Sequence, residues 1–376
     1  MGLLPRVSWM WFVQTSTVGP PGRKGVEMRA LTVVPLQKQS LRVEDVPDPI
    51  AGPGELLVDG IALGICGTDR DIARGDYGWL PPGKSRMVLG HESLGRVKTV
   101  PEGSAFAPGD LVVGIVRRPD PVPCGACARG QWDMCRNGRY VERGIKEIDG
   151  YGSTSWVVRE DFAVRLDPAL EQVGVLLEPT TVVAKAWDQI EKINGRAWFD
   201  PRTVLVTGAG PIGLLAALLG QQRGLDVHVL DRVSGGTKQE LVEALGATFH
   251  TRTAAAVADE IRPDIVIEAT GSPAVALQAM EIDNPGVIVC LTGVSTPGVD
   301  TDVDVGELNR NIVLDNALVF GSVNANRDHY EQGAQALATA DESWLARLIT
   351  RRLPLERALE AFEAGGSDIK VVIDLA

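Results

Sequence analysis

Thiol, imidazole and carboxylate side chains in the first half of the chain have the types and spacing of metal ligands. Cys66 follows a β-type run, the pair His91 and Glu92 comes later in the same region, and Glu178 lies further along the chain. All three chemical groups bind zinc, and a catalytic zinc ion keeps one position open for water or substrate. The pattern predicts a metal site, although Cys66 or His91 alone would be typical of a buried structural residue. Asp69 is predicted to accept a hydrogen bond from His91 and so to orient the imidazole.

Three further cysteines lie close together in one predicted loop. Cys124 and Cys127 have the spacing of a metal-binding pair, and Cys135 follows shortly after them. Closed structural zinc sites use four ligands, so one ligand is missing. Pro121 stands where a regular spacing would place a fourth cysteine, and the adjacent Asp120 could supply an oxygen ligand. The sequence predicts either a second, structural zinc ion or a loop that holds metal only weakly.

A glycine-rich segment follows a predicted strand, Val204–Thr207, and opens a predicted helix, Ile212–Arg223. Glycines at such positions allow a tight turn, close approach of a pyrophosphate to the backbone, and tight packing of helix on strand. The segment therefore predicts a dinucleotide-binding loop in preference to a plain turn. The residues expected to contact the cofactor are Gly208, Gly210, Pro211, Ile212 and Gly213.

An acidic residue, Asp231, ends the next predicted strand, Asp226–Leu230. Its distance from the glycine-rich segment is close to the roughly 20 residues at which a carboxylate holds the ribose hydroxyls of NAD. A carboxylate would repel the extra phosphate of NADP, but Arg232 beside it would offset that repulsion. We therefore expect NAD, NADP or both as cofactor, with a mild preference for NAD. The alternative is a solvated charge at the end of a strand.

The elements that must position these residues are of two kinds. From Met28 to about Val158, short β-type runs separated by glycine and proline predict an irregular, barrel-like β domain. After a helical segment, Thr180–Ile193, strands and helices alternate from Thr203, which predicts a parallel, doubly wound sheet. The first part contains the runs Leu31–Val34, Glu55–Ile61, Glu92–Val100, Asp110–Val116 and Ser155–Val158. The second continues with a helix at Gln239–Leu245 and strands at Ile265–Glu268 and Val287–Leu291.

The tail of the chain has no nucleotide-binding motif. Beyond Asn326 the sequence predicts helices at His329–Ala338 and Leu355–Ala364 and a strand at Lys370–Asp374. We expect this tail to return to the first domain.

Composition limits the class of protein. The chain has 376 residues, of which 44% are hydrophobic and 23% charged, and a formal net charge of −12. These values suit a globular protein of two domains, and the negative charge argues against a nucleic-acid partner. No run of about 18 apolar residues suggests a membrane span. Five cysteines, an odd number, favour a reducing compartment, so a cytoplasmic location is expected. Residues 1–27 lack the features of a signal peptide and are predicted to be a disordered extension.

Together these motifs resemble the zinc-dependent medium-chain dehydrogenases over nearly the whole chain from Met28. Within that superfamily the sequence is most similar to the glucose 1-dehydrogenases. The motifs that carry the resemblance are Cys66-Gly67-Thr68-Asp69, Gly90-His91-Glu92, the three-cysteine loop, Glu178-Pro179 and Gly208–Gly213. The closer cues are Arg117-Arg118-Pro119, Glu142 and Gly321–Asn326.

The resemblance implies an α/β fold with two domains. Residues 28–185 and 328–376 would form a GroES-like catalytic domain of β-barrel type, and residues 186–327 a Rossmann domain with a doubly wound parallel sheet. Homodimers or homotetramers are frequent in such proteins. The three-cysteine loop departs from the family pattern because it lacks one of the four ligands of a closed zinc site. Asp231-Arg232 also differs from the more basic turn of NADP-preferring members.

The activity implied by the resemblance is transfer of a hydride from C1 of D-glucose, or a related aldose, to NAD(P)⁺. The product would be the aldonolactone, and zinc would act as a Lewis acid. Cys66, His91 and Glu178 match catalytic zinc positions, with Glu92 close enough to bind in some states. Thr68 matches a catalytic residue that touches the sugar near the reacting hydroxyl. Residues matching positions that hold sugar or cofactor are Glu142, Glu178, Thr292, Gly293, Val294, Ser322 and Asn324.

Two alternatives remain open at this stage. The first keeps the enzyme class but changes the substrate to a polyol or secondary alcohol, as in sorbitol or threonine dehydrogenases. The second is a non-catalytic NAD(P)-binding regulator, which would hold no zinc at Cys66.

Overall fold

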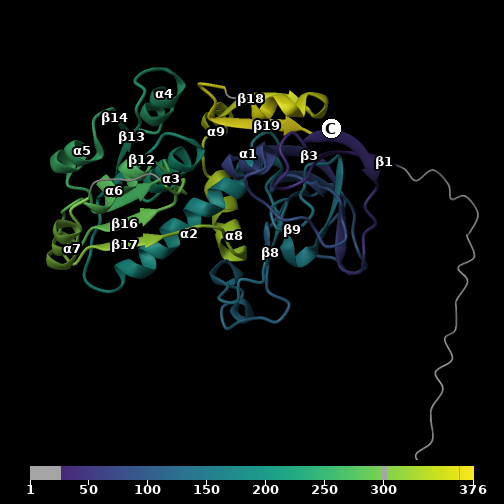
Figure 1. Cartoon of the computed structure of the whole chain (residues 1–376), viewed down its shortest axis with the longest axis horizontal. Coiled ribbons are helices and arrows are strands. Elements are labelled where there is room, and N and C mark those ends of the chain that lie inside the picture. The colour runs from purple at the N-terminus through teal and green to yellow at the C-terminus, as the bar shows by residue number, and fades with distance from the viewer. Residues whose placement is uncertain (1–26, 299–302, 364) are drawn as a thin grey trace, which may run out of the picture.

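A computed structural model describes residues 27–298, 303–363 and 365–376 of the chain. The extension predicted for residues 1–27 lies outside this part, apart from Glu27, which is the first residue of strand β1 (Glu27–Val33). Figure 1 shows two regions of different construction beside each other, with the helices α2 and α8 between them. None of the described helices combines the length and apolar character needed to cross a membrane.

The first region is built on a seven-stranded, mostly antiparallel sheet. Its central strand β3 (Glu55–Ile65) pairs with β5 (Glu92–Thr99) on one side and with β19 (Lys370–Asp374) on the other. Alternate residues of β3 are buried in its first half and all are buried near its end, so the strand passes from the sheet surface into the core. The remaining strands of this sheet are β6 (Leu111–Gly114), β10 (Ser155–Arg159), β11 (Ala163–Arg165) and β18 (Ile349–Pro354).

This region also contains two small sheets, one α-helix and several short 3₁₀ helices. One sheet contains β1, β2 (Arg42–Pro47) and β4 (Met87–Val88); the other contains β7 (Arg117–Arg118), β8 (Val141–Arg143) and β9 (Glu147–Ile148). The helix α1 (Gly67–Arg74) follows β3 directly. Short 3₁₀ helices lie at Cys127–Arg129, Trp132–Met134, Glu160–Phe162, Pro168–Leu170 and Gly174–Leu176. The first two of these belong to a lobe that projects from the body below α8 (Figure 1).

The second region is a six-stranded, entirely parallel sheet with the order β14-β13-β12-β15-β16-β17. Numbered from its first strand, this order is 3-2-1-4-5-6, which is that of a doubly wound dinucleotide-binding sheet. The fold class predicted from the alternation of strands and helices is therefore confirmed. The strands are β12 (Thr203–Thr207), β13 (Asp226–Leu230), β14 (Thr248–His250), β15 (Ile265–Glu268), β16 (Ile288–Leu291) and β17 (Leu318–Gly321).

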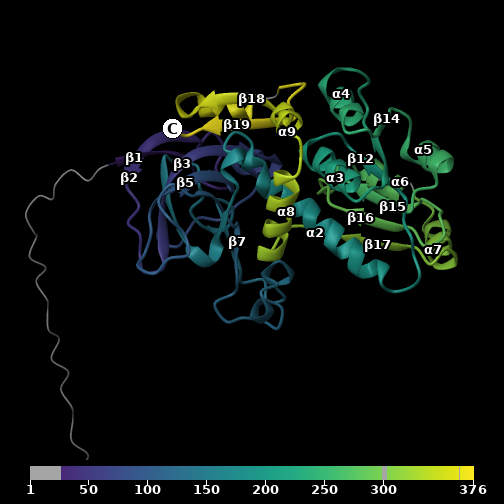
Figure 2. The same cartoon turned by 180° about the vertical axis from the view of Figure 1, so that it is seen from behind.

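Helices cover both faces of this sheet (Figure 2). Helix α3 (Pro211–Gln222) is apolar around most of its circumference because it is buried between the sheet and α2 (Leu177–Asn194). Helix α8 (Arg327–Ala338) packs closely on α2, and a Cβ atom at Gly333 would lie only 3.0 Å from the Leu177 side chain. The other helices are α4 (Gly236–Ala244), α5 (Ala254–Ile261), α6 (Pro273–Met280), α7 (Val305–Leu314) and α9 (Glu342–Leu348).

The predicted elements agree with the structure where the apolar pattern is strong. The strands at Asp226–Leu230, Ile265–Glu268 and Lys370–Asp374 have the predicted bounds. Strands β14 and β17 were not predicted. The segment Leu355–Phe362 is a 3₁₀ helix with a kink at Arg357, where we had predicted an α-helix over Leu355–Ala364. Ala364 itself lies outside the described residues.

Candidate functional site

The pairing of β3 with β5 brings the first predicted metal ligands together. Gly64 lies opposite Glu92 in this antiparallel pair, so the end of β3 lies beside the start of β5. Cys66 Sγ is 3.2 Å from His91 Nε2, and the ligand atoms of Cys66, His91 and Glu92 all lie within 4.8 Å of one another. A glycine is required at position 64, because a Cβ atom there would meet the Glu92 carboxylate at 2.0 Å.

Asp69 faces both Cys66 and His91. One carboxylate oxygen accepts a hydrogen bond from the Cys66 backbone N–H at 2.9 Å, which caps helix α1. The other lies 3.2 Å from His91 Nδ1, in a geometry too bent for a well-aligned hydrogen bond. The imidazole thus presents Nδ1 to a carboxylate and Nε2 to the thiol, which is the arrangement of a metal-binding histidine. Thr68, in the first turn of the same helix, is half-buried.

Burial and charge oppose each other in this group. Burial raises the pKa of the Cys66 thiol, although His91 acts in the opposite direction. For His91, burial favours the neutral ring, but the charges of Asp69 and Cys66 outweigh it and hold the pKa well above its ordinary value. Coordination of a divalent cation would reverse the preference of the thiol, because a metal-bound thiol loses its proton. Thiol, imidazole and carboxylate donors at this separation fit a zinc ion.

Glu92 has a partner that sequence reasoning missed. Lys370 Nζ lies 2.6 Å from both Glu92 carboxylate oxygens, and both side chains are 2% exposed. The only sequence signal was a charged residue that opens a strand and is followed by three apolar residues.

Glu178 lies in the first turn of α2 and faces the same group. Burial raises the pKa of its carboxyl to about 7, with Glu92 acting in the same direction and His91 against it. Within the described residues, its carboxylate is not part of the close cluster formed by Cys66, His91 and Glu92.

The glycine-rich loop has the geometry of a phosphate cradle. Gly208 has φ of 97°, in the left-handed region, and a Cβ atom at Gly213 would meet the Gly208 carbonyl oxygen at 1.7 Å. A Cβ atom at Gly210 would meet nothing within 4 Å, so the turn leaves open space before the N-terminus of α3. Pro211 is the first residue of that helix and Ile212, half-buried, follows it. This arrangement fits the pyrophosphate of a dinucleotide.

At the end of β13, Asp231 is held by the glycine-rich loop and by a lysine. Its Oδ2 accepts hydrogen bonds from the Ala209 backbone N–H at 2.9 Å and from Lys238 Nζ at 3.0 Å. Its Oδ1 accepts from the backbone N–H of Arg232 at 2.7 Å. Burial opposes ionisation, but the Ala209 N–H and Lys238 outweigh it and lower the pKa of the Asp231 carboxyl. Lys238 is a second residue that sequence reasoning missed.

The remaining residues predicted to bind cofactor follow β16 and β17, at the same edge of the sheet as the glycine-rich loop. Thr292 donates its hydroxyl to the Glu268 carbonyl oxygen at 2.7 Å, and the Gly293 N–H donates to the same oxygen at 3.1 Å. Val294 is 85% exposed. The Ser322 hydroxyl is buried and has no hydrogen-bond partner among the described residues. A buried hydroxyl normally has a partner, so this one fits contact with a bound molecule.

Glu142 and Asn324 come from different regions and meet. Asn324 Nδ2 donates to Glu142 Oε1 at 2.6 Å, and Arg117 donates to the same oxygen from Nε and Nη2 at 3.1 and 3.0 Å. Asn324 has φ of 64°, a left-handed conformation that asparagine tolerates better than most residues. The two predicted sugar-binding residues therefore lie in one polar group, in which Glu142 is buried and Asn324 is half-buried.

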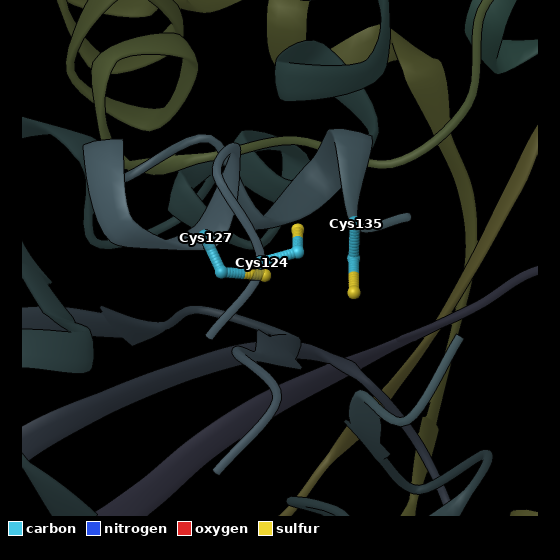
Figure 3. A group of neighbouring side chains, drawn as sticks. All are labelled: Cys124, Cys127 and Cys135. Carbon is cyan, nitrogen blue, oxygen red and sulfur yellow. The ribbon is translucent and has the colours of Figure 1, made fainter. Parts of the chain in front are cut away.

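The three cysteines of the lobe also form a group (Figure 3). The sulfur atoms of Cys124, Cys127 and Cys135 lie within 4.8 Å of one another. Backbone N–H groups, that of Arg136 first, lower the pKa of the Cys124 thiol to about 6, whereas burial raises that of Cys127 to about 11. Three thiols can hold a zinc ion but do not complete a closed site.

The Asp120 carboxylate does not join the cysteines. It accepts hydrogen bonds from the Val122 N–H at 2.8 Å, from Asn137 Nδ2 at 2.8 Å and from Arg139 Nε at 3.1 Å. Sequence proximity had suggested Asp120 as a fourth ligand, but these local bonds hold its side chain elsewhere. A zinc ion in the lobe would therefore have three ligands from the described residues.

A buried lysine ties the lobe to the second region. Lys185, on α2, lies 2.9 Å from the Asp133 carboxylate of the lobe and donates to the Val323 carbonyl oxygen at 2.9 Å. Both charged side chains are almost fully buried. The lobe and the segment that carries Ser322 and Asn324 are thereby held against the same helix.

Comparisons with known proteins find similar sequences over almost the whole chain. The family model "Glucose dehydrogenase C-terminus" matches residues 171–375, and "Alcohol dehydrogenase GroES-like domain" matches residues 52–168. The chain is 38% identical to a glucose 1-dehydrogenase of Methanocella arvoryzae over 357 residues, covering 93% of this chain and 99% of that protein. It is 38% identical to a glucose 1-dehydrogenase of Thermoproteus tenax over 354 residues, with the same coverage of both.

A solved structure shares the fold. Haloferax mediterranei glucose dehydrogenase, in complex with NADP, Zn and gluconolactone, superposes with a TM-score of 0.85 at 30% identity. The match covers 93% of this chain and 99% of that one.

Proposed function

The chain belongs to the glucose dehydrogenase family, and we propose that it is a zinc-dependent glucose 1-dehydrogenase that uses NAD(P)⁺. The resemblance inferred from the sequence motifs is confirmed by the family matches. The observation that carries the proposal is the close group of Cys66, His91 and Glu92 in a chain that also holds an open glycine-rich loop at Gly208–Gly213. The reaction is transfer of a hydride from C1 of D-glucose, or a related aldose, to the nicotinamide, giving the lactone.

We propose that Cys66, His91 and Glu178 hold the zinc ion, with Glu92 as a further ligand in some states. When bound, zinc supplies a Lewis acid that favours ionisation of the substrate hydroxyl. The Asp69 carboxylate, 3.2 Å from His91 Nδ1, would orient the ring so that Nε2 faces the metal position. Thr68, in the first turn of α1, would contact the sugar near the reacting hydroxyl and pass its proton outward.

Glu142 and Asn324 are proposed to select a polyhydroxylated substrate. A simple alcohol would leave unused the hydrogen-bonding capacity that these two side chains have beyond their contacts with each other and with Arg117. A site that hydrogen-bonds substrate hydroxyls can discriminate by about 10⁴-fold. The hydrogen bond between them supports the proposal, because it brings these side chains from two regions into one position.

The cofactor is proposed to lie along the carboxyl edge of the parallel sheet. The backbone of the loop Gly208–Gly213 would bind the pyrophosphate and Asp231 the adenosine ribose. Contacts from Arg232, Thr292, Gly293, Val294, Ser322 and Asn324 would complete the site. We propose that both NAD and NADP are used, with a mild preference for NAD.

We also propose the domain division, assembly and location. Residues 28–185 and 328–376 form the catalytic domain, and residues 186–327 the nucleotide-binding domain. The membership of β18 and β19 in the sheet of β3 supports this division. A homodimer or homotetramer in the cytoplasm is proposed, without a nucleic-acid or membrane partner.

A substrate panel tests the proposed function. Purified protein is assayed with D-glucose, D-galactose, D-xylose, sorbitol and a secondary alcohol, each with NAD⁺ and with NADP⁺. We expect oxidation of D-glucose or a related aldose, loss of activity on chelation and in His91→Ala, and recovery of the chelated wild type when zinc is added. If sorbitol or the secondary alcohol is oxidised and no aldose is, the proposed substrate class is wrong. Nucleotide binding without zinc at Cys66 would favour the non-catalytic alternative.

A further inference from the structure

Lys185 is a buried lysine to which the proposed function gives no role. It lies on α2, the helix between the two regions (Figure 1). Its Nζ atom lies 2.9 Å from the Asp133 carboxylate of the lobe and donates to the Val323 carbonyl oxygen at 2.9 Å. The Lys185 and Asp133 side chains are only 4% and 1% exposed. Apolar side chains of similar volume often stabilise a fold as well as such a buried ion pair, so stability alone does not account for it.

The partners of this lysine lead to the proposed sugar-binding residues from two sides. The Asp133 backbone carbonyl oxygen accepts a hydrogen bond from Arg117 Nη1 at 3.1 Å, and Arg117 also donates to Glu142 Oε1. Val323 directly precedes Asn324, whose Nδ2 donates to the same carboxylate oxygen at 2.6 Å. The contacts therefore form a closed chain that begins and ends at the ammonium group of the buried lysine.

Regular secondary structure does little to fix the two sugar-binding side chains. Residues 322–326 form neither helix nor strand, and Asn324 has a left-handed backbone with φ of 64°. Glu142 lies in β8, a strand of three residues. Because Lys185 binds the Val323 carbonyl oxygen and the lobe together, it holds the segment beside Asn324 against the same point as the lobe.

We propose that Lys185 is a positioning residue for substrate recognition, which holds Glu142 and Asn324 together so that they bind a sugar hydroxyl group as a pair. The inference rests on the proposed function, since it requires an aldose at these two side chains. Lys185 acts through its partners in the lobe and at Val323. Without the lysine the two side chains could shift relative to each other, and a displacement of about 1 Å can lower an enzymatic rate by about 100-fold.

Deoxy sugars test this role, because each of them lacks one hydroxyl group. The kcat/KM values of D-glucose and of its 2-, 3-, 4- and 6-deoxy derivatives are measured for the wild type, Glu142→Gln and the double variant Lys185→Met, Asp133→Asn. The double variant removes both charges of the buried pair and so leaves neither one without a partner. A second double variant, Lys185→Gln, Asp133→Asn, keeps a shorter donor and carries the test if circular dichroism shows that the first does not fold. Lys192→Met is the matched control, because Lys192 lies on the same helix and is 59% exposed in its ion pair with Asp188.

We expect at least one deoxy sugar to be a poor substrate of the wild type. The preference for D-glucose over this sugar should fall by about tenfold or more in Glu142→Gln, the usual effect of losing a hydrogen bond to a charged group, which identifies the hydroxyl group. The same preference should fall by a similar factor in Lys185→Met, Asp133→Asn, by a smaller factor in Lys185→Gln, Asp133→Asn, and not at all in Lys192→Met. A general loosening of the fold would instead lower kcat/KM for all the sugars alike and leave the preference unchanged. A wild-type preference in a folded double variant would overturn the inference.

The wild type separates failure of the inference from failure of the proposed function. If it oxidises D-glucose and the double variants keep its preference, only the inference about Lys185 is wrong. If it oxidises every deoxy sugar as well as D-glucose, the inference is wrong as well, because no hydroxyl group is then recognised. If it oxidises no aldose, the proposed function is wrong and the inference falls with it.

Discussion

Lys370 Nζ lies 2.6 Å from both carboxylate oxygens of Glu92, and the two charged side chains are buried together at the edge of the candidate metal group. Lys370 belongs to β19, near the end of the chain, whereas Glu92 opens β5. The two strands are joined only through β3, which pairs with both. The last described strand thus supplies the cation that is paired with one carboxylate of the candidate metal group.

Replacing Lys370 by methionine is expected to lower the free energy of unfolding by about 3–5 kcal/mol, because the change leaves a buried carboxylate without a partner. Urea denaturation measures the change. Lys98→Met is the control, since the exposed pair of Lys98 with Asp59 should be worth less than about 1 kcal/mol. The double variant Glu92→Gln, Lys370→Met should recover part of the loss. Equal losses in Lys370→Met and Lys98→Met would contradict this account of the pair.

Asp69→Asn is expected to weaken zinc binding at Cys66 and His91 by roughly 10–100-fold, the usual effect of removing the group that orients a histidine ligand. Competition with a chelating dye measures the affinity. Asp71→Asn is a matched control on the same helix, because Asp71 pairs with Arg74 on the exposed side. Unchanged affinity in Asp69→Asn, with the fold intact by circular dichroism, would argue against the orienting role.

Zinc in the three-cysteine lobe should be released more easily than zinc at Cys66. The lobe offers three thiols, and Asp120 is held away from them by Asn137 and Arg139. We expect two release steps as chelator is added, the first absent in Cys135→Ser and the second absent in Cys66→Ser. A single step that is absent in Cys66→Ser but present in Cys135→Ser would mean that the lobe holds no zinc. Loss of the tighter metal in Cys135→Ser would contradict the expected order of release.

Asn326 and His329 cap the N-terminus of α8, and His329 makes the free energy of unfolding depend on pH. His329 Nδ1 accepts the Asn326 N–H at 3.2 Å, and Nε2 lies 3.3 Å from Asp188, so the neutral ring fits both contacts. Burial lowers the pKa of His329 below its ordinary value of 6.5, although Asp188 opposes the change. As the pH falls, the ring gains its proton near pH 6.5 in the unfolded chain but only at a lower pH in the folded protein. The contribution to stability is therefore complete above pH 6.5 and is lost as the pH falls through the lower folded value.

Urea denaturation at pH 7.5, 6.5 and 5.5 tests this dependence in the wild type and in His329→Gln. We expect His329→Gln to be less stable at pH 7.5 and to lose less stability than the wild type between pH 7.5 and 5.5. Parallel losses in the two proteins would mean that His329 does not contribute to the pH dependence.

Much of the site was predictable because its residues stand at the ends of strands. The apolar run before Gly208 and the helix after it identify the loop, and antiparallel neighbours bring Cys66 to His91 once a β domain is expected. Lys370 and Lys238 were not predictable in the same way. Each has a partner set by tertiary pairing, and no periodic pattern marks a lysine whose ammonium group is to be buried beside a carboxylate.

Asp120 is the reverse case, because the sequence suggested that it binds metal and the structure places its carboxylate elsewhere. Its position next to Pro121 suggested a ligand, but an aspartate in a turn also bonds to nearby backbone and side-chain donors, and here those bonds prevail. Sequence distance indicates which residues are near a site, while the direction of a side chain depends on its competing partners.

The origin of the transferred hydride tests the central claim most directly. D-Glucose labelled with deuterium at C1 is oxidised with NAD⁺ and with NADP⁺, and the reduced cofactor and the sugar product are examined by mass spectrometry. We predict one deuterium on the reduced nicotinamide, a primary isotope effect under conditions where hydride transfer limits the rate, and the lactone or its hydrolysis product as the oxidised sugar. Unlabelled reduced cofactor, or label transferred only from glucose deuterated at another carbon, would contradict the assignment.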